Sequence, residues 1–253
     1  LANRDLIYLG VSGDGDSASI GFGQFAHSIR RGVNMTYIVE NNGVYGLTKG
    51  QFSATADRGS KSKKGVMNTD NAVDLVAIAL QLGASFVARS FSGDKSQLVP
   101  LIAAAIEHKG AAFIDVVSPC VAFNNHAGST KSFDYVREHN DAVNRLDVLT
   151  GREPISVDYA PGTVQVVEQH DGSKIALRKI DADYDAHDRV GAMSFLQKHA
   201  AKGQIVTGLL YVDPEADDLH THLNTVETPL NALDAHELCP GTPALDKINA
   251  SLR

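Results

Sequence analysis

The chain has 253 residues, of which 43% are apolar and 21% are charged, so it is long enough to form a large domain with a sizeable core. Its formal net charge of -7 argues against a nucleic-acid-binding protein, because such a domain is normally basic. No apolar run approaches the roughly 20 residues of a membrane-spanning helix, and no secretory signal pattern is visible. We therefore expect a cytoplasmic protein that binds neither nucleic acid nor membrane.

Short apolar runs alternate with helical patterns through the first half of the chain. Strands are predicted at residues 6–11, 35–39, 85–88 and 113–117, and helices at residues 18–29, 73–80 and 98–106. Gly32, Gly83 and Gly110 follow these helical patterns, where glycine commonly ends a helix. The alternation predicts an α/β fold with a doubly wound parallel sheet and helices on both faces.

The pattern changes in the second half of the chain. Residues 164–168 and 174–177 flank an Asp-Gly turn and predict a β-hairpin. Residues 213–253 show neither helical nor strand periodicity, and we expect them to form an irregular tail that packs on a partner subunit. The predicted organisation is a sheet domain over residues 1–150 and a C-terminal extension over residues 151–253.

Polar motifs follow the first two predicted strands. Asp14, within Gly13-Asp14-Gly15, follows the first strand, and Asn42 follows the second. The carboxyl ends of parallel strands meet at one edge of a sheet, so these side chains should lie close together. Mg²⁺ prefers hard oxygen ligands, which the Asp14 carboxylate, the Asn42 amide and the Val44 carbonyl can supply. Flanking glycines and a following helix start suit a phosphate, so a magnesium-diphosphate site is predicted.

A simpler interpretation of both motifs is also available. Gly-Asp-Gly and Asn-Asn-Gly are each common turn sequences when they occur alone. Their joint occurrence at strand ends one crossover apart favours the diphosphate site. A nucleotide-binding or regulatory module, in which Gly-Asp-Gly only forms a turn, remains open as an alternative.

Longer strings around these motifs carry a family resemblance. The spacing GDG-x25-NN resembles the thiamine-diphosphate signature. The strings GDGDSASIG, NNGVYGLTKGQ and SPCVAFNN resemble the β subunit of 2-oxoacid:ferredoxin oxidoreductases, most closely over residues 6–140. The resemblance implies a thiamine-diphosphate-binding fold with magnesium held by Asp14, Asn42 and the Val44 carbonyl. The residues that it assigns to the cofactor site are Gly13, Asp14, Gly15, Asp16, Asn42, Val44, Gly46, Leu47 and Thr48.

The resemblance also implies a reaction. It is the oxidative decarboxylation of a 2-oxoacid, with coenzyme A as acyl acceptor and ferredoxin as electron acceptor, reversible as CO₂ fixation. The Thr-Lys-Gly form of the sequence at Lys49 suggests 2-oxoglutarate as the substrate. The glutamate that activates the cofactor is expected from an α subunit, so no catalytic residue is assigned in this chain.

Cys120, in Ser118-Pro119-Cys120, matches the fourth ligand of the family's 4Fe-4S cluster. The other three cysteines belong to an N-terminal segment that the family has and this sequence lacks. The chain starts at Leu1 without Met, which predicts a piece of a longer protein; a relative that lost its cluster is the alternative. Cys120 as a buried thiol in a non-oxidative thiamine-diphosphate decarboxylase or synthase also remains open.

A loop rich in lysine follows the second motif. Lys49 could face a substrate carboxylate or a cofactor phosphate, or it could be solvated. Arg58, Lys61, Lys63 and Lys64 form the main basic cluster of an acidic chain. Such clusters are usually solvated, but this one could attract ferredoxin or the phosphates of coenzyme A.

Four histidines and the second cysteine are weaker candidates. His27 lies on the first crossover helix, where a half-buried structural histidine is expected, and His126 could line the mouth of the site. His220 and His222 would share one face of a strand, but a metal site there is not favoured because the segment resembles a tail. Cys239 is interpreted as structural.

Overall fold

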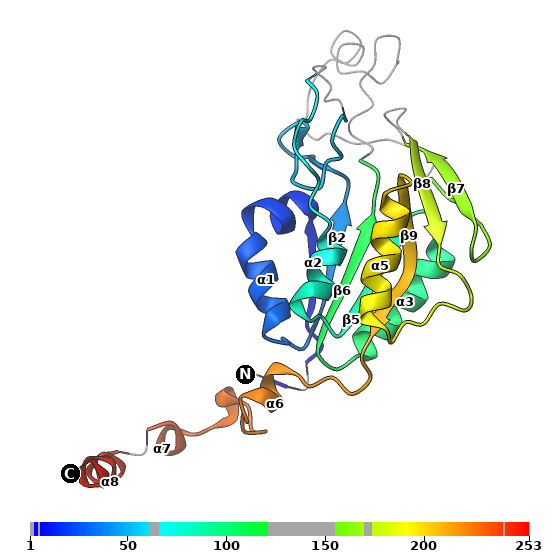
Figure 1. The fold of residues 1–253 in the computed structure, drawn as a ribbon. Helices are drawn as coiled ribbons and strands as arrows, with labels where there is room; N and C mark the ends of the chain where they lie inside the picture. Colours follow the sequence, from blue (N-terminus) through cyan, green and yellow to red (C-terminus); the bar gives the residue numbers. More distant parts are fainter. Residues whose placement is uncertain are drawn as a thin grey trace, which may run out of the picture.

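The computed structural model of the chain describes residues 3–4, 6–60, 66–120, 155–169, 174–239 and 241–252. These residues build a seven-stranded sheet in the order β1-β2-β6-β5-β9-β8-β7 (Figure 1). Its strands are β1 (Leu9–Gly13), β2 (Met35–Asn41), β5 (Phe86–Phe91), β6 (Ala111–Val117), β7 (Val164–Glu168), β8 (Lys174–Lys179) and β9 (Gln204–Val212). A separate two-stranded ribbon pairs β3 (Val44–Tyr45) with β4 (Gln51–Phe52). The helices are η1 (Gly15–Ile20), α1 (Phe22–Arg30), α2 (Leu75–Leu82), α3 (Lys95–Glu107), α5 (Arg189–Ala200), α6 (Leu219–His222), η3 (Leu230–Ala232), α7 (Ala235–Leu238) and α8 (Thr242–Ser251).

The sheet is mixed rather than wholly parallel. Strands β1, β2, β6 and β5 pair in parallel, as the alternation of strands and helices predicts. Strand β9 then pairs antiparallel with β5 and parallel with β8, and β7 and β8 form the predicted antiparallel hairpin. The sheet therefore continues past the boundary predicted at residue 150, because β9 and the preceding α5 extend it beyond β5.

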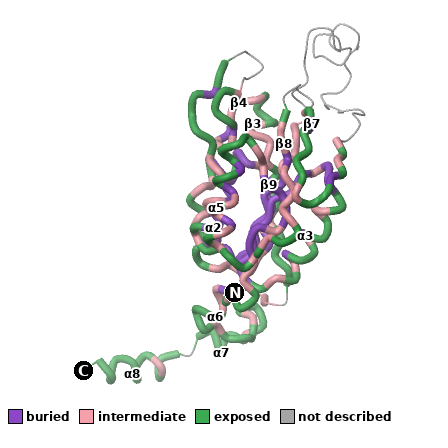
Figure 2. The backbone as a smooth tube through the Cα atoms, turned by 45° about the vertical axis from the view of Figure 1, so that its right-hand side comes forward, coloured by how far each residue is buried: buried purple, intermediate pink, exposed green. Residues whose placement is uncertain are grey.

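Helices cover both faces of the sheet, which confirms the doubly wound arrangement. On one face, α1, α2 and α5 bury side chains such as Phe25, Leu80 and Leu196 against the strands. On the other face, α3 buries Leu101 and Ala105 against β2, β5 and β6. The buried residues gather along the central strands (Figure 2). Among the described helices, none has the length and hydropathy needed to cross a membrane.

The first predicted helix is interrupted. A single π-helical turn, η1, is followed by α1, and the two meet at Gly21, whose N–H donates to the Asp16 carbonyl at 2.5 Å. A Cβ at Gly21 would lie 2.8 Å from that carbonyl oxygen, so only glycine fits without a shift. Gly32, at a φ of 64°, closes α1 as predicted, with its N–H donating to the Ile29 carbonyl and the Val33 N–H donating to the Ser28 carbonyl.

Residues 213–239 and 241–252 form a C-terminal arm (Figure 1). Its first part stays attached to the body, because the N–H groups of Asp213 and Leu219 donate to the carbonyls of Ser85 and Gly32, and the arm leaves the body after α6. The arm carries α6, η3, α7 and α8, and α8 lies farthest from the sheet. The expectation of no regular structure in this segment is wrong for α8, a ten-residue helix with Pro243 in its first turn. Leu245, Ile248 and Leu252 recur at helical spacing, a short pattern that sequence reasoning missed.

A cluster of charged side chains lies inside the sheet domain. The guanidinium of Arg89 donates to Asp115 at 2.7 Å and to Asp74 at 2.5 Å, and we call these three residues the Arg89 cluster. Asp115 is 1% exposed and Arg89 is 9% exposed. Burial raises the pKa of the Asp115 carboxyl above its usual value, and Arg89 opposes that rise. Asp74 also caps the N-terminus of α2.

Replacing Arg89 should destabilise the fold strongly. In Arg89→Met, the Asp115 carboxylate loses its cationic partner while it remains buried, which costs about 3–5 kcal/mol. Lys174→Met is the matched control: it breaks an ion pair with Glu168 in which both side chains are about two-thirds exposed, so a loss below about 1 kcal/mol is expected. Urea unfolding of the two variants measures the difference, and equal losses would contradict the structural role of the Arg89 cluster.

Candidate functional site

The predicted site residues come together at the carboxyl ends of three adjacent strands. Asp14 directly follows β1, and Asn42 directly follows β2. Cys120 lies three residues beyond the end of β6, which pairs with β2. The parallel order β1-β2-β6 therefore puts all three at one edge of the sheet, as the sequence predicts.

The Asp14 carboxylate accepts four hydrogen bonds from the described residues. It is buried, with the residue 1% exposed. Oδ1 accepts the Asn42 N–H at 3.2 Å, and Oδ2 accepts the Gly43 N–H at 3.1 Å. Oδ2 also accepts the hydroxyl groups of Thr55, at 2.5 Å, and Ser53. One carboxylate thus joins the end of β1 to the turn after β2 and to the loop after β4.

The oxygens around Asp14 fit a hard divalent cation. From the described residues, Asp14 Oδ1 accepts one N–H, and Asn42 Oδ1 accepts the Val44 N–H alone, at 3.0 Å. Each of these oxygens keeps electron pairs for a further contact. Asp14 makes none of the ion pairs found in the described part of the chain, so its charge lacks a basic partner there. A carboxylate and an amide oxygen are suitable Mg²⁺ ligands.

The described residues contain no group of three His, Cys, Asp or Glu side chains that could hold a metal. A cation at this edge would therefore depend on Asn42 and backbone carbonyls as well as on Asp14. The Val44 carbonyl belongs to β3, which starts two residues after Asn42. Such a mixed oxygen set is typical of Mg²⁺, which takes few protein ligands and completes its octahedron with phosphate and water.

The turn after Asp14 is shaped by close packing. Gly15 is buried at the start of η1, and a Cβ there would lie 2.5 Å from the ring of Tyr45. Gly13 has open space, because the nearest atom to its ideal Cβ is a carboxylate oxygen of Asp16 at 4.0 Å. The π-helical turn is a rare form that often occurs at functional sites. Gly15 therefore lets the Asp14 turn pack against β3, while Gly13 leaves room for a ligand.

The loop between β3 and β4 presents the remaining predicted cofactor residues. Leu47 is 98% exposed, and Thr48 is exposed and donates to Gln51 at 2.5 Å. Lys49 is also exposed and adopts a φ of 76°, a left-handed conformation that few L-residues favour. At the base of the loop, an ideal Cβ on Gly46 lies 3.8 Å from Cys120 Sγ. The structure thus brings this loop to the cysteine predicted as a cluster ligand.

Asp16, one of the predicted cofactor residues, is exposed in η1 with its carboxylate near Gly13. The weaker sequence candidates make no described hydrogen bond to Asp14 or Asn42, or they lie outside the described residues. Arg58 is exposed, and His27 is exposed on α1 rather than half-buried. His220 and His222 belong to the short helix α6, so the expectation that they share a strand face is wrong. Cys239 is exposed, which does not fit a structural core thiol. Lys61, Lys63, Lys64 and His126 lie outside the described residues.

Sequence reasoning missed the second set of donors to Asp14. Ser53 and Thr55 come from a loop with no motif, and only folding shows that it passes over the carboxylate. The Ala54 N–H in the same loop donates to Ser19 at 3.1 Å, so the loop is also attached to η1. Further along this loop, burial raises the pKa of Asp57 above its usual value, and Arg89 opposes the rise.

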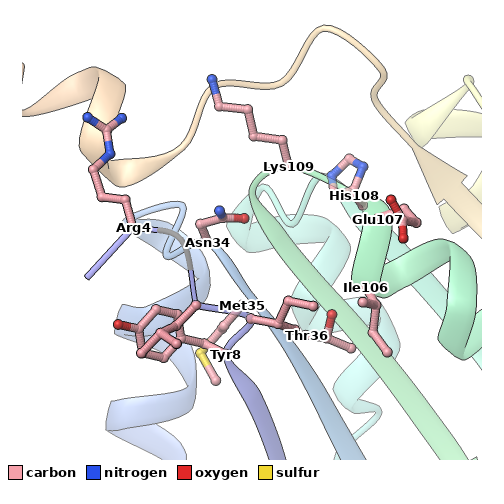
Figure 3. Close-up of a pocket in the computed structure, with 11 residues that line it drawn as sticks. Arg4, Tyr8, Asn34, Met35, Thr36, Ile106, Glu107, His108 and Lys109 are labelled. Atoms are coloured by element: carbon pink, nitrogen blue, oxygen red, sulfur yellow. The ribbon is translucent and has the colours of Figure 1, made fainter. Parts of the chain in front are cut away.

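A cavity of about 210 Å³ lies elsewhere, at the amino ends of the strands (Figure 3). The residues that line it include Arg4, Tyr8, Met35, Ile106, His108 and Lys109. Burial lowers the pKa of His108 below its usual value. Ligands of open α/β sheets bind at the carboxyl ends of the strands, so this cavity is not the candidate site.

The part of the chain that contains Asp14 and Asn42 also matches a known protein family. Residues 1–116 match the family model described as thiamine pyrophosphate enzyme, C-terminal TPP binding domain. The chain is 37% identical over 198 residues to a 2-oxoacid:ferredoxin oxidoreductase subunit beta of a Sulfolobus species, covering 78% of this chain and 59% of that protein. It is also 37% identical over 177 residues to 2-oxoglutarate oxidoreductase subunit KorB of Mycobacterium tuberculosis, covering 70% of this chain and 46% of that protein. The chain thus spans about half to three-fifths of these relatives.

A solved structure resembles the whole fold. It is 2-oxoglutarate:ferredoxin oxidoreductase from Magnetococcus marinus, with 2-oxoglutarate, coenzyme A and succinyl-CoA bound. The TM-score is 0.63 at 27% identity, and the match covers 96% of this chain and 68% of that chain. By sequence and by fold, the chain resembles the β subunits of 2-oxoacid:ferredoxin oxidoreductases.

Proposed function

We propose that this chain binds thiamine diphosphate through Mg²⁺ at the edge formed by β1, β2 and β6. The observation that carries the proposal is the buried Asp14 carboxylate, which holds the turn after β2 in place and has no basic partner among the described residues. The match to the thiamine pyrophosphate enzyme model supports the cofactor. Asp14, Asn42 and the Val44 carbonyl would hold the cation.

The diphosphate would lie over the turn at Gly13 and beside the β3–β4 loop. Open space at Gly13 supports this position, and the backbone at Gly46, Leu47 and Thr48 could approach the phosphates from the loop side. Ser53 and Thr55 would act indirectly, because their hydroxyl groups occupy Asp14 Oδ2 and direct Oδ1 toward the cation. The chain's own residues thus bind and orient the cofactor.

The proposed reaction is the CoA-dependent oxidative decarboxylation of a 2-oxoacid, most simply 2-oxoglutarate, with electrons passed to ferredoxin. Thiamine diphosphate supplies the nucleophilic carbon that makes such decarboxylation possible. The ligands in the Magnetococcus marinus structure support 2-oxoglutarate and coenzyme A as substrates. An α subunit would provide the group that activates the cofactor. Cys120, next to Gly46, would contribute one ligand to a 4Fe-4S cluster.

We further infer that the C-terminal arm contacts a partner subunit. Its large apolar residues Leu238, Leu245, Ile248 and Leu252 are between 54% and 81% exposed. An isolated helix as short as α8 is marginal in water, so packing against another surface would stabilise it. This supports an extension that mediates assembly, as expected for residues 213–253.

Removing the Asp14 charge should weaken magnesium-dependent cofactor binding. Asp14→Asn keeps the side-chain shape, and the hydroxyl groups of Ser53 and Thr55 can rotate to accept from the new amide, but the Gly43 N–H loses its acceptor. A thermal melt therefore first establishes that the variant is folded. Calorimetric titration of the cofactor-free complex with Mg²⁺ and thiamine diphosphate should give an affinity more than about 10-fold weaker, since even residues that only support metal ligands have effects of that size.

A variant of the second proposed ligand and a control variant complete this titration. Asn42→Ala leaves the Asp14 carboxylate and its donors intact, and it should also weaken binding. Glu168→Gln, an exposed change on β7, should bind like the wild type. Wild-type affinity in Asp14→Asn would contradict the magnesium site, and a wild-type complex that binds no diphosphate would favour the regulatory alternative.

Cys120 should be required for the iron-sulfur cluster but not for the cofactor. In the anaerobically purified complex with its native N-terminus, Cys120→Ser should lose visible iron-sulfur absorbance and ferredoxin reduction while it still binds thiamine diphosphate. Cys239→Ser, at an exposed thiol, is the matched control and should retain both. Iron-free wild-type protein that binds the cofactor would instead support a non-oxidative thiamine-diphosphate enzyme.

A further inference from the structure

Asn41, the last residue of β2, pairs with Val117 of β6 in the sheet and makes two further hydrogen bonds to the β6 side. Its side-chain Nδ2 donates to Asp115 Oδ1 at 3.1 Å, and its backbone carbonyl accepts the Ser118 N–H at 2.8 Å. Asn42 would hold the cation through its side-chain oxygen, whereas the side chain of Asn41 is directed to Asp115.

The position of Asn41 connects two loops of the candidate site. The two N–H groups that follow it along the chain, at Asn42 and Gly43, both donate to Asp14. On the β6 side, Ser118 lies two residues before Cys120. A shift of Asn41 would therefore move the turn that holds the Asp14 carboxylate, and it would also release the segment that carries the cysteine.

The acceptor of the Asn41 amide is unusually well fixed. Asp115 is 1% exposed, and its Oδ2 accepts Arg89 Nε at 2.7 Å. Arg89 is held in turn by Asp74 at the N-terminus of α2. The ion pair with Arg89 and the hydrogen bond from Asn41 leave the buried Asp115 side chain little freedom to move. Asp115 therefore holds the Asn41 side chain in a fixed position at the end of β2.

We propose that Asn41, held by Asp115 and Arg89, is a positioning residue that sets the Asn42–Gly43 turn for the divalent cation. This inference rests on the proposed magnesium site. The amide is suited to the role because it donates to a buried carboxylate and adds no charge. An aspartate at position 41 would place a second carboxylate against Asp115, and an alanine would leave the turn attached only through its backbone.

The test compares divalent-cation binding in variants of the complete α/β complex. Mn²⁺ replaces Mg²⁺ in octahedral oxygen sites and is counted by electron paramagnetic resonance of the free ion. With thiamine diphosphate present, Asn41→Ala should bind Mn²⁺ about 10-fold more weakly, the usual effect of losing a residue that orients a metal ligand. Asp115→Asn, which weakens the same contact from the other side, should shift the affinity in the same direction.

Lys179→Met provides a matched control. It breaks an ion pair with the buried Asp94 at 3.3 Å, and neither residue has a described hydrogen bond or ion pair with Asn41 or Asp14. A comparable loss of thermal stability is expected with unchanged Mn²⁺ affinity. If Asn41→Ala binds Mn²⁺ like the wild type, or if Lys179→Met weakens binding equally, Asn41 is a structural residue and the inference is wrong.

Amide hydrogen exchange tests the positioning role of Asn41 without depending on cation binding. In Asn41→Ala, the amides of residues 42–44 and 118–120 should exchange faster than in the wild type, whereas Lys179→Met should leave them unchanged. If wild-type protein binds no Mn²⁺, the magnesium proposal fails. Faster exchange would then still establish that Asn41 positions the two loops, and unchanged exchange would overturn that role as well.

Discussion

The architecture of the candidate site depends on the hydrogen bonds that the Asp14 carboxylate accepts. Two backbone N–H groups after β2 and two hydroxyl groups after β4 converge on this one side chain. Hydrogen bonds to an ionised acceptor are among the stronger ones in proteins, and burial strengthens them further. Three loops that belong to different parts of the sequence are thereby held around one negative charge.

That arrangement explains why the surrounding residues are small or polar. Gly15 lets η1 approach Tyr45, and Gly21 lets η1 end in a π-turn before α1 begins. The hydroxyl groups of Ser12, Ser17 and Tyr37 form a hydrogen-bonded group next to this turn, with distances from 2.5 to 3.0 Å. Bulky or apolar residues here would separate the strand end from the turn and leave buried donors without acceptors.

Much of the sheet was predictable because its causes are local. Alternating strands and helices predict parallel pairing, and glycine at the end of α1 explains where that helix stops. The position of β9 was not predictable, since a buried apolar run does not reveal its direction or its partner. In the structure, β9 pairs antiparallel with β5 and parallel with β8, while α5 packs in the same hydrophobic cluster as α2 on one face of the sheet.

The sequence by itself determined that Asp14 and Asn42 share the carboxyl edge of the sheet, because their distance from the strand ends is a property of the chain and the handedness of a crossover is nearly invariant. Only the tertiary structure decided which groups complete that edge. Ser53, Thr55 and Asp115 reach it through contacts between residues 39 to 74 positions apart. No periodicity encodes such contacts, because they arise from the packing of whole elements rather than from any local pattern.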